Sequence, residues 1–172
     1  DAAPALGTVD ALEADGKTAI VVAVDGTVAG VMGIADRLRP EAREAIAGLK
    51  ERGIETLMLS GDAERVAAAI AKRAGVDRFQ GGVRPETKVA VTEELQGQGK
   101  VVAMVGDGVN DAPALAAADV GIAMGTGTDV AMETAGVTLM RPDPRLVGAA
   151  LDVSRATWSK IWQNLFWAFI YN

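Results

Sequence analysis

Short apolar runs alternate with longer stretches of helical apolar spacing between residues 40 and 140. Such alternation is typical of α/β proteins, in which right-handed crossover helices connect the strands of a parallel sheet. Strands are predicted at 54–59, 101–105, 120–124 and 137–140, with a weaker one near Phe79, and helices at 63–74, 85–96, 112–118 and 129–134. Pro40 suits the first position of a further helix, which Gly53 is expected to end. We therefore expect one parallel sheet flanked by helices.

Two apolar runs, at 18–24 and 28–34, precede this region and flank the dipeptide Asp25-Gly26. Asp-Gly accepts the positive φ angles of a two-residue hairpin turn. The sequence thus predicts an antiparallel hairpin ahead of the parallel sheet.

A long helix is predicted at the C-terminus. Asp143 and Pro144 are typical of a helix start, and Gly148 is the only breaker that follows. Six of the seven aromatic residues lie in the last fifteen positions, and residues 161–172 carry no charge. Twelve residues are fewer than the ~20 that a membrane-spanning helix needs. We expect a segment of a larger protein that ends partway into a membrane helix, with Arg155 and Lys160 at the cytoplasmic surface.

Composition restricts the chemistry. The sequence has no Cys and no His, which excludes disulfides, thiolate or imidazole metal ligands and histidine-dependent nucleophiles. Its 17 basic and 23 acidic residues give a net charge of -6, which argues against a nucleic-acid partner bound through a basic face. Carboxylates, lysines, hydroxyls and backbone amides remain.

Polar groups follow three predicted strands, where ligands bind in open parallel sheets. Ser60-Gly61-Asp62 offers a hydroxyl, a glycine amide and a helix N-terminus, which suit a phosphate oxygen. Residues 106–111, Gly-Asp-Gly-Val-Asn-Asp, place two carboxylates and a carboxamide in one turn, and oxygen ligands of this kind suit Mg²⁺. The third loop, 125–129, predicts a turn and a helix cap.

Lys88 lies in the first turn of the helix predicted at 85–96. The helix dipole disfavours a cation there, so we expect an anion to neutralise it. A hydroxyl, a lysine and an acidic turn along one sheet are the electrostatic parts of phosphoryl transfer. Taken singly, Ser60-Gly61-Asp62 is better explained as a strand-to-helix turn, and Lys88 as a solvated surface lysine.

The sequence at 105–115, Val-Gly-Asp-Gly-Val-Asn-Asp-Ala-Pro-Ala-Leu, resembles the hinge signature of P-type ATPases. Ser60-Gly61-Asp62 resembles their Thr-Gly-Asp loop, and residues 36–40 resemble the strand that returns from the nucleotide domain. Residues 154–157 and 163–168, with the final Tyr171-Asn172, look like the copper-exporting members of the heavy-metal class.

This resemblance implies a Rossmann-like α/β fold of the haloacid dehalogenase type. It also implies three parts: 1–36 as the end of a nucleotide-binding domain, 37–150 as the phosphorylation domain and 151–172 as the start of a transmembrane helix. The cofactors implied are Mg²⁺ and ATP, with Cu⁺ as the transported ion. The partners implied are the actuator, nucleotide-binding and membrane domains of the same polypeptide, with residues 1 to about 158 in the cytoplasm.

Matched position by position, the resemblance assigns roles around the acidic turn. Asp107 would bind Mg²⁺, and Asn110 and Asp111 would order the loop. Lys88 would lie between this loop and the phosphoryl group.

The remaining roles fall on other parts of the chain. Ser60 and Gly61 would hold a phosphate oxygen, and Asp62 would lie near the nucleotide. Tyr171 and Asn172 would belong to the membrane copper site, although Cu⁺ prefers sulfur over phenol or amide oxygen.

The Asp-Lys-Thr-Gly-Thr motif of the family, with its phosphorylated Asp, does not occur in this sequence. The chain is therefore not expected to form a phosphoenzyme by itself. The alternatives are a zinc or cadmium ATPase, a soluble haloacid dehalogenase-like phosphatase and a non-catalytic module. Residues 23–27, Ala-Val-Asp-Gly-Thr, imitate the end of the phosphatase motif Asp-x-Asp-Gly-Thr, but Ala23 stands at the nucleophile position.

Overall fold

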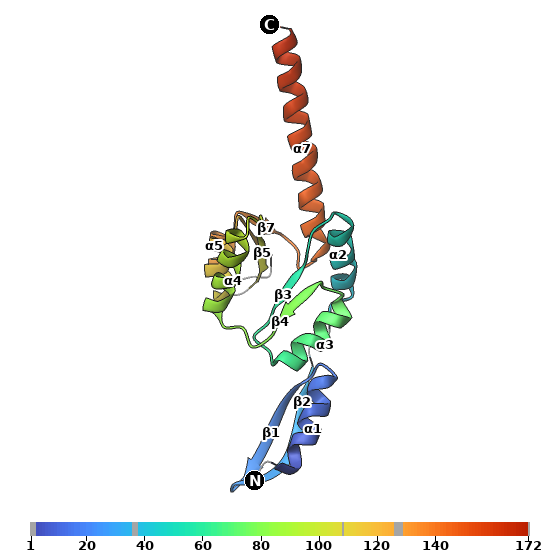
Figure 1. Ribbon diagram of the computed structural model, residues 1–172, viewed down its shortest axis with the longest axis vertical. Helices are drawn as coiled ribbons and strands as arrows, with labels where there is room; N and C mark the ends of the chain where they lie inside the picture. The colour runs from blue at the N-terminus through green and yellow to red at the C-terminus, as the bar shows by residue number, and fades with distance from the viewer. Residues whose placement is uncertain (1–2, 36–37, 108, 126–128, 172) are drawn as a thin grey trace.

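The computed structural model describes residues 3–35, 38–107, 109–125 and 129–171. A helix-covered hairpin lies at one end of the molecule, an α/β body forms the middle, and one long helix projects from the other end (Figure 1).

The N-terminal unit consists of α1 (Ala3–Ala14) and a hairpin of β1 (Thr18–Val24) and β2 (Thr27–Ile34). Asp25 and Gly26 form the turn with φ angles of 48° and 78°, so the predicted hairpin is confirmed. Helix α1 was not predicted. Its inward positions are Ala5, Val9 and Leu12, a helical spacing that the sequence does contain.

The body begins with α2 (Pro40–Glu51), β3 (Leu57–Leu59), α3 (Glu64–Ala74), β4 (Arg78–Gln80) and α4 (Pro85–Gly97). Strands β3 and β4 pair in parallel. It continues with β5 (Ala103–Gly106), the 3₁₀ turn η1 (Val109–Asp111), α5 (Ala112–Ala117), β6 (Val120–Met124), α6 (Asp129–Thr134) and β7 (Val137–Leu139). Strands β5, β6 and β7 form a parallel sheet in that order.

The predicted α/β fold, with parallel strands, flanking helices and a long C-terminal helix, is confirmed. The strands do not form one sheet within the described residues, because β3–β4 and β5–β6–β7 form separate hydrogen-bonded ladders. The first strand of each ladder, β3 or β5, is also shorter than predicted and begins later in the chain. The backbone N–H of Thr56 is bound by the carboxylate of Asp77, and that of Val102 by the carboxylate of Asp119. These N–H groups are therefore not available for strand pairing.

The core lies against the three-stranded sheet. Ile122, Leu139 and Val147 form one buried cluster, on which Leu49 of α2 packs. This cluster joins the three-stranded sheet to α2 and to the start of the C-terminal helix. The two halves of the body, one built on β3–β4 with α2 and the other on β5–β6–β7, therefore share an apolar centre.

Helix α7 (Arg145–Ile170) has 26 residues and is therefore about 39 Å long. It begins one residue after the predicted Pro144, and the Asp143 carboxylate accepts a hydrogen bond from the Arg145 N–H at 3.0 Å. Every described position from 152 to 171 is exposed. Within the described residues, no helix combines the length and apolar character needed to cross a bilayer.

Candidate functional site

The acidic turn follows β5 directly. Gly106 ends this strand, and a Cβ at this position would lie 2.6 Å from the Cβ and 2.9 Å from the Oδ2 of Asp111. Only glycine allows the chain to fold back this closely, so Gly106 determines where the Asp111 carboxylate lies. Asp111 then leads straight into α5, where Leu115 is buried at 2% exposure.

Lys88 and Asp111 form an ion pair, with Nζ and Oδ1 2.6 Å apart. Their side chains are only 17% and 13% exposed, so water screens this pair less than a surface pair. Lys88 lies in the first turn of α4, as predicted, and Asp111 is the anion that neutralises it. The pair ties α4 to the acidic turn.

The loop after β3 is closed on itself. The Ser60 hydroxyl donates to the Asp62 carboxylate at 2.8 Å and accepts from the Asp62 N–H at 3.2 Å. Gly61 and Asp62 are exposed, and Ser60 is half-buried. This arrangement is a small side-chain turn, and it leaves the Gly61 backbone on the surface.

The backbone of Ser60 links this loop to the entry of α4. Its N–H donates to Gln80 O at 3.0 Å, and its carbonyl accepts from Val83 N at 2.9 Å. Residue 83 leads into the first turn of α4, which carries Lys88. The described structure therefore joins Lys88 directly to Asp111, and to Ser60 only through the backbone, without a side-chain contact between Ser60 and Lys88.

Asp107 is exposed, and its carboxylate makes no hydrogen bond or ion pair with any residue that the structure describes. Asp111, by contrast, is already paired with Lys88. Within the described ranges, no group of three or more acidic side chains is arranged to hold a metal ion. Asp107 is thus the one carboxylate of the turn that is open to a cation, and Mg²⁺ commonly takes only one or two carboxylates.

Asn110 is exposed in η1, within the acidic turn. Tyr171 lies elsewhere, as the exposed C-cap of α7, the helix that projects from the body (Figure 1). Asn172 lies outside the described residues, as do Gly108, residues 36–37 of the return strand and residues 126–128 of the third loop.

A second contact, between the start of α3 and the loop after β4, was not predicted. The Glu64 carboxylate accepts a hydrogen bond from the Gly81 N–H at 2.7 Å, and a Cβ on Gly81 would lie 2.6 Å from Glu64 Cα. The Gly81-Gly82 pair was the sequence signal for a close backbone approach, but nothing in the sequence identified Glu64 as the partner.

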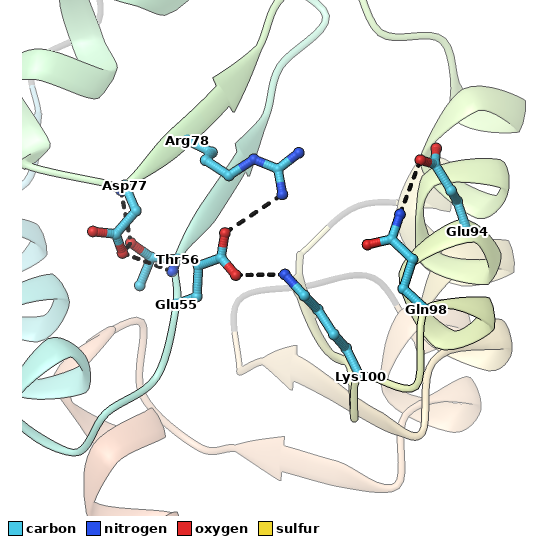
Figure 2. Close-up of polar contacts among 7 residues, drawn as sticks. All are labelled: Glu55, Thr56, Asp77, Arg78, Glu94, Gln98 and Lys100. Atoms are coloured by element: carbon cyan, nitrogen blue, oxygen red, sulfur yellow. Dashed lines mark hydrogen bonds and ion pairs between the residues drawn. The ribbon is translucent and has the colours of Figure 1, made fainter.

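Polar contacts of a different kind gather at the amino ends of the strands (Figure 2). The Glu55 carboxylate contacts Lys100 Nζ at 2.6 Å and Arg78 Nη1 at 3.4 Å, and the hydrogen bond from Lys100 is the main reason why the pKa of Glu55 is lowered. This cluster bridges the segments that precede β3 and β5.

The neighbouring Asp77 is bound more fully. Its Oδ1 contacts Lys50 Nζ at 2.7 Å, and its Oδ2 accepts from the hydroxyl of Thr56 at 2.8 Å and from the Thr56 N–H at 2.9 Å. The bond from Lys50, followed by those from Thr56, lowers the pKa of Asp77 from 3.8 to about 2. Thr56 itself is buried at 7% exposure. These contacts fix the amino end of the β3–β4 pair.

Comparison with known proteins agrees with this architecture. Residues 3–119 match the haloacid dehalogenase-like hydrolases. The chain is 50% identical over 167 residues to the copper-exporting P-type ATPase of Bacillus subtilis (strain 168), covering 97% of this chain and 21% of that protein. It is 51% identical over 163 residues to the silver exporting P-type ATPase of Salmonella typhimurium, covering 95% of this chain and 20% of that protein.

A solved structure gives the same result. A zinc-transporting PIB-type ATPase in the E2.Pi state superimposes with a TM-score of 0.80 at 42% identity, covering 95% of this chain and 27% of that one. The chain spans about a fifth of the length of the curated relatives named here. It belongs to the haloacid dehalogenase-like hydrolase family and, within that family, to the heavy-metal P-type ATPases.

Proposed function

We propose that this chain supplies the Mg²⁺-binding and phosphate-binding loops of an ATP-driven copper(I) exporter. The observation that carries the proposal is the Lys88–Asp111 pair, which is held at 2.6 Å beside a Gly106 that tolerates no side chain. A cation and an acidic turn fixed in this way suit a site where phosphoryl charge must be stabilised without rearrangement.

The proposed roles follow from what each group is free to do. Asp107, exposed and without a partner among the described residues, would hold Mg²⁺, which neutralises phosphoryl charge when bound. An ammonium group has three donors, so Lys88 can keep Asp111 and still donate to a phosphoryl oxygen. Asn110 and Asp111 would order the turn between them.

The Ser60 loop would bind a phosphate oxygen through its hydroxyl and the exposed Gly61 backbone. A serine hydroxyl has a single proton, which Ser60 now donates to Asp62. Phosphate binding therefore requires this hydroxyl to turn away from Asp62, which is then available to the nucleotide.

The phosphorylated aspartate must come from another part of the polypeptide, since the motif that carries it does not occur in this sequence. The interruption between β3–β4 and β5–β6–β7 supports a position for the strand that would carry this aspartate. Long side chains, Glu55 and Lys100, bridge the starts of β3 and β5, where paired strands would be joined by backbone bonds. We place the missing strand between β3 and β5.

Copper is favoured as the ion because the Bacillus subtilis relative is named a copper exporter and the Salmonella relative a silver exporter, and both transport soft cations. We propose that α7 continues into the membrane and that Tyr171 and Asn172 lie near the ion. The body of the chain would then lie in the cytoplasm, with the actuator, nucleotide-binding and membrane domains as its partners.

A chimera tests the catalytic part of the proposal. The matching segment of the Bacillus subtilis ATPase is replaced by this chain, and phosphoenzyme is measured with γ-labelled ATP. The chimera should form phosphoenzyme, and Asp107→Asn should reduce it to background. Asp25→Asn, in the hairpin turn, is the matched control and should leave it unchanged. Normal phosphoenzyme in the Asp107 variant would remove Asp107 from the mechanism.

Zinc is the second candidate ion, because the zinc-transporting ATPase is 42% identical with a TM-score of 0.80. The ATPase activity of the full polypeptide that carries this chain distinguishes the two ions. Copper export predicts stimulation by Cu⁺ and silver but not by Zn²⁺, and the reverse pattern would assign the protein to the zinc class.

A further inference from the structure

Helices α2 and α7 run side by side and are joined by two arginine ion pairs about two turns apart. Arg145 Nη1 contacts the Glu44 carboxylate at 3.0 Å. Further along both helices, Arg52 binds Asp152 through two parallel bonds, Nε to Oδ1 at 3.0 Å and Nη2 to Oδ2 at 2.6 Å. A joint fixed at two separated points resists rotation, which a single contact does not.

The guanidinium of Arg52 occupies space that two glycines leave open. Its Nη1 donates to the Gly48 carbonyl at 2.6 Å, and a Cβ on Gly48 would lie 3.2 Å from that nitrogen. A Cβ on Gly148 would lie 3.4 Å from Arg52 Cζ. Glycine inside a helix lowers its stability relative to alanine. The room that Arg52 requires explains Gly48, whereas a Cβ on Gly148 would be in ordinary van der Waals contact with the guanidinium, which only a larger side chain would displace. The sequence had marked Gly148 only as a possible breaker.

Beyond this joint, the described residues of α7 make no hydrogen bond or ion pair with another element. Asp152 is the last residue of α7 that bonds to another element, and every later described position is exposed. The free part runs from 152 to 170, which is about 27 Å. A rotation of about 10° at the joint would therefore displace the far end by about 5 Å.

We propose that Arg52, held between Gly48 and Gly148 and paired with Asp152, locks α7 to α2 so that the projecting helix moves as one body with the domain that carries the phosphoryl site. The lock itself is a property of this chain. Its use, to pass movement of the site on to the ion pathway, rests on the proposed function.

Electron spin distance measurement on this chain tests the lock. The sequence has no cysteine, so Lys72→Cys on α3 and Asn164→Cys on α7, both exposed, introduce the only labelling sites. We expect a narrow distance distribution in the parent. Arg52→Met should broaden it or shift it by about 5 Å. Arg43→Met, at an exposed arginine of α2, the helix that Arg52 caps, should leave it unchanged. An unchanged distribution in Arg52→Met overturns the proposal.

Gly148→Leu separates the lock from general stability. Leucine favours helix over glycine, so the helical content measured by circular dichroism should be kept or increased. The same side chain displaces the Arg52 guanidinium, so the distance distribution should broaden as in Arg52→Met. A distribution as narrow as that of the parent would contradict the lock, even if Arg52→Met failed to fold.

The chimera tests the use of the lock. Arg52→Met should form as much phosphoenzyme as the unsubstituted chimera but lose copper transport into vesicles per phosphoenzyme formed. Equal transport would overturn the coupling role. Absence of phosphoenzyme in the unsubstituted chimera would count against the proposed function alone, because the spin distances still judge the lock.

Discussion

Both parallel sheets begin at an aspartate that directly precedes their second strand. Asp77 binds the N–H of Thr56 at the start of β3–β4, and Asp119 binds the N–H of Val102 at the start of β5–β6. In each case one carboxylate replaces the first backbone bond of the ladder. The two halves of the body therefore share one structural solution at their amino ends.

The carboxyl ends of the two sheets differ. The Ser60 loop satisfies its own polar groups through Asp62 and remains exposed. The acidic turn is instead braced from another helix, by a half-buried Lys88 on Asp111. Because the amino ends of the two sheets are alike, we infer that they serve stability in both halves of the body. The carboxyl ends differ, and only that of β5–β6–β7 presents a charged site that is already fixed in place.

The largest expected effect separates the two carboxyl ends. Asp111→Asn leaves the half-buried Lys88 without its anion and should lower the free energy of unfolding by about 2 kcal/mol. Asp62→Asn in the exposed loop should cost less than about 0.5 kcal/mol, because an amide oxygen still accepts from Ser60. Urea unfolding measures both. Equal losses would show that the acidic turn is no better fixed than the Ser60 loop.

A smaller effect, on the pH dependence of stability, distinguishes Asp77 at the amino end of β3–β4 from Asp119 at the amino end of β5–β6. The pKa of Asp77 is lowered from 3.8 to about 2, so its carboxylate stabilises the fold above pH 3.8, and this contribution is lost as the pH falls from about 4 to 2. Asp77→Asn should therefore flatten the fall of the urea midpoint in this range. Asp119→Asn should flatten it less, because the lowered pKa of Asp119 depends mainly on the backbone N–H of Val102, without an ion pair. A parent midpoint that does not change below pH 4 would refute this assignment.

The smallest effect concerns the link between the halves. Glu55 and Lys100 are 46% and 42% exposed, so Glu55→Gln should change the free energy of unfolding by less than about 0.5 kcal/mol, as solvent-exposed pairs do. The double variant with Lys100→Met should show a coupling energy of the same small size. A larger value, measured by a double-mutant cycle in urea, would mean that this pair and not the apolar centre holds the halves together.

Local signals in the sequence were enough for many elements. The Asp25-Gly26 turn and the bounds 120–124 and 129–134 were predicted as they are found, because turn chemistry and apolar runs act over a few residues. Helix α1 was overlooked although Ala5, Val9 and Leu12 have helical spacing. The identity of the acidic turn and the need for an anion near Lys88 were also readable from neighbouring residues.

By itself, then, the sequence determined the family and the order of helices and strands from α2 onward, and it proposed the residues of the site, since each depends on residues close together in the chain. Only the tertiary structure decided that Asp111 is the partner of Lys88, that the sheet is divided after β4, and that Arg52 lies against Gly48 and Gly148 and pairs with Asp152. These features join positions 23 and 100 residues apart. The packing of the whole chain selects such partners, and no local pattern encodes them.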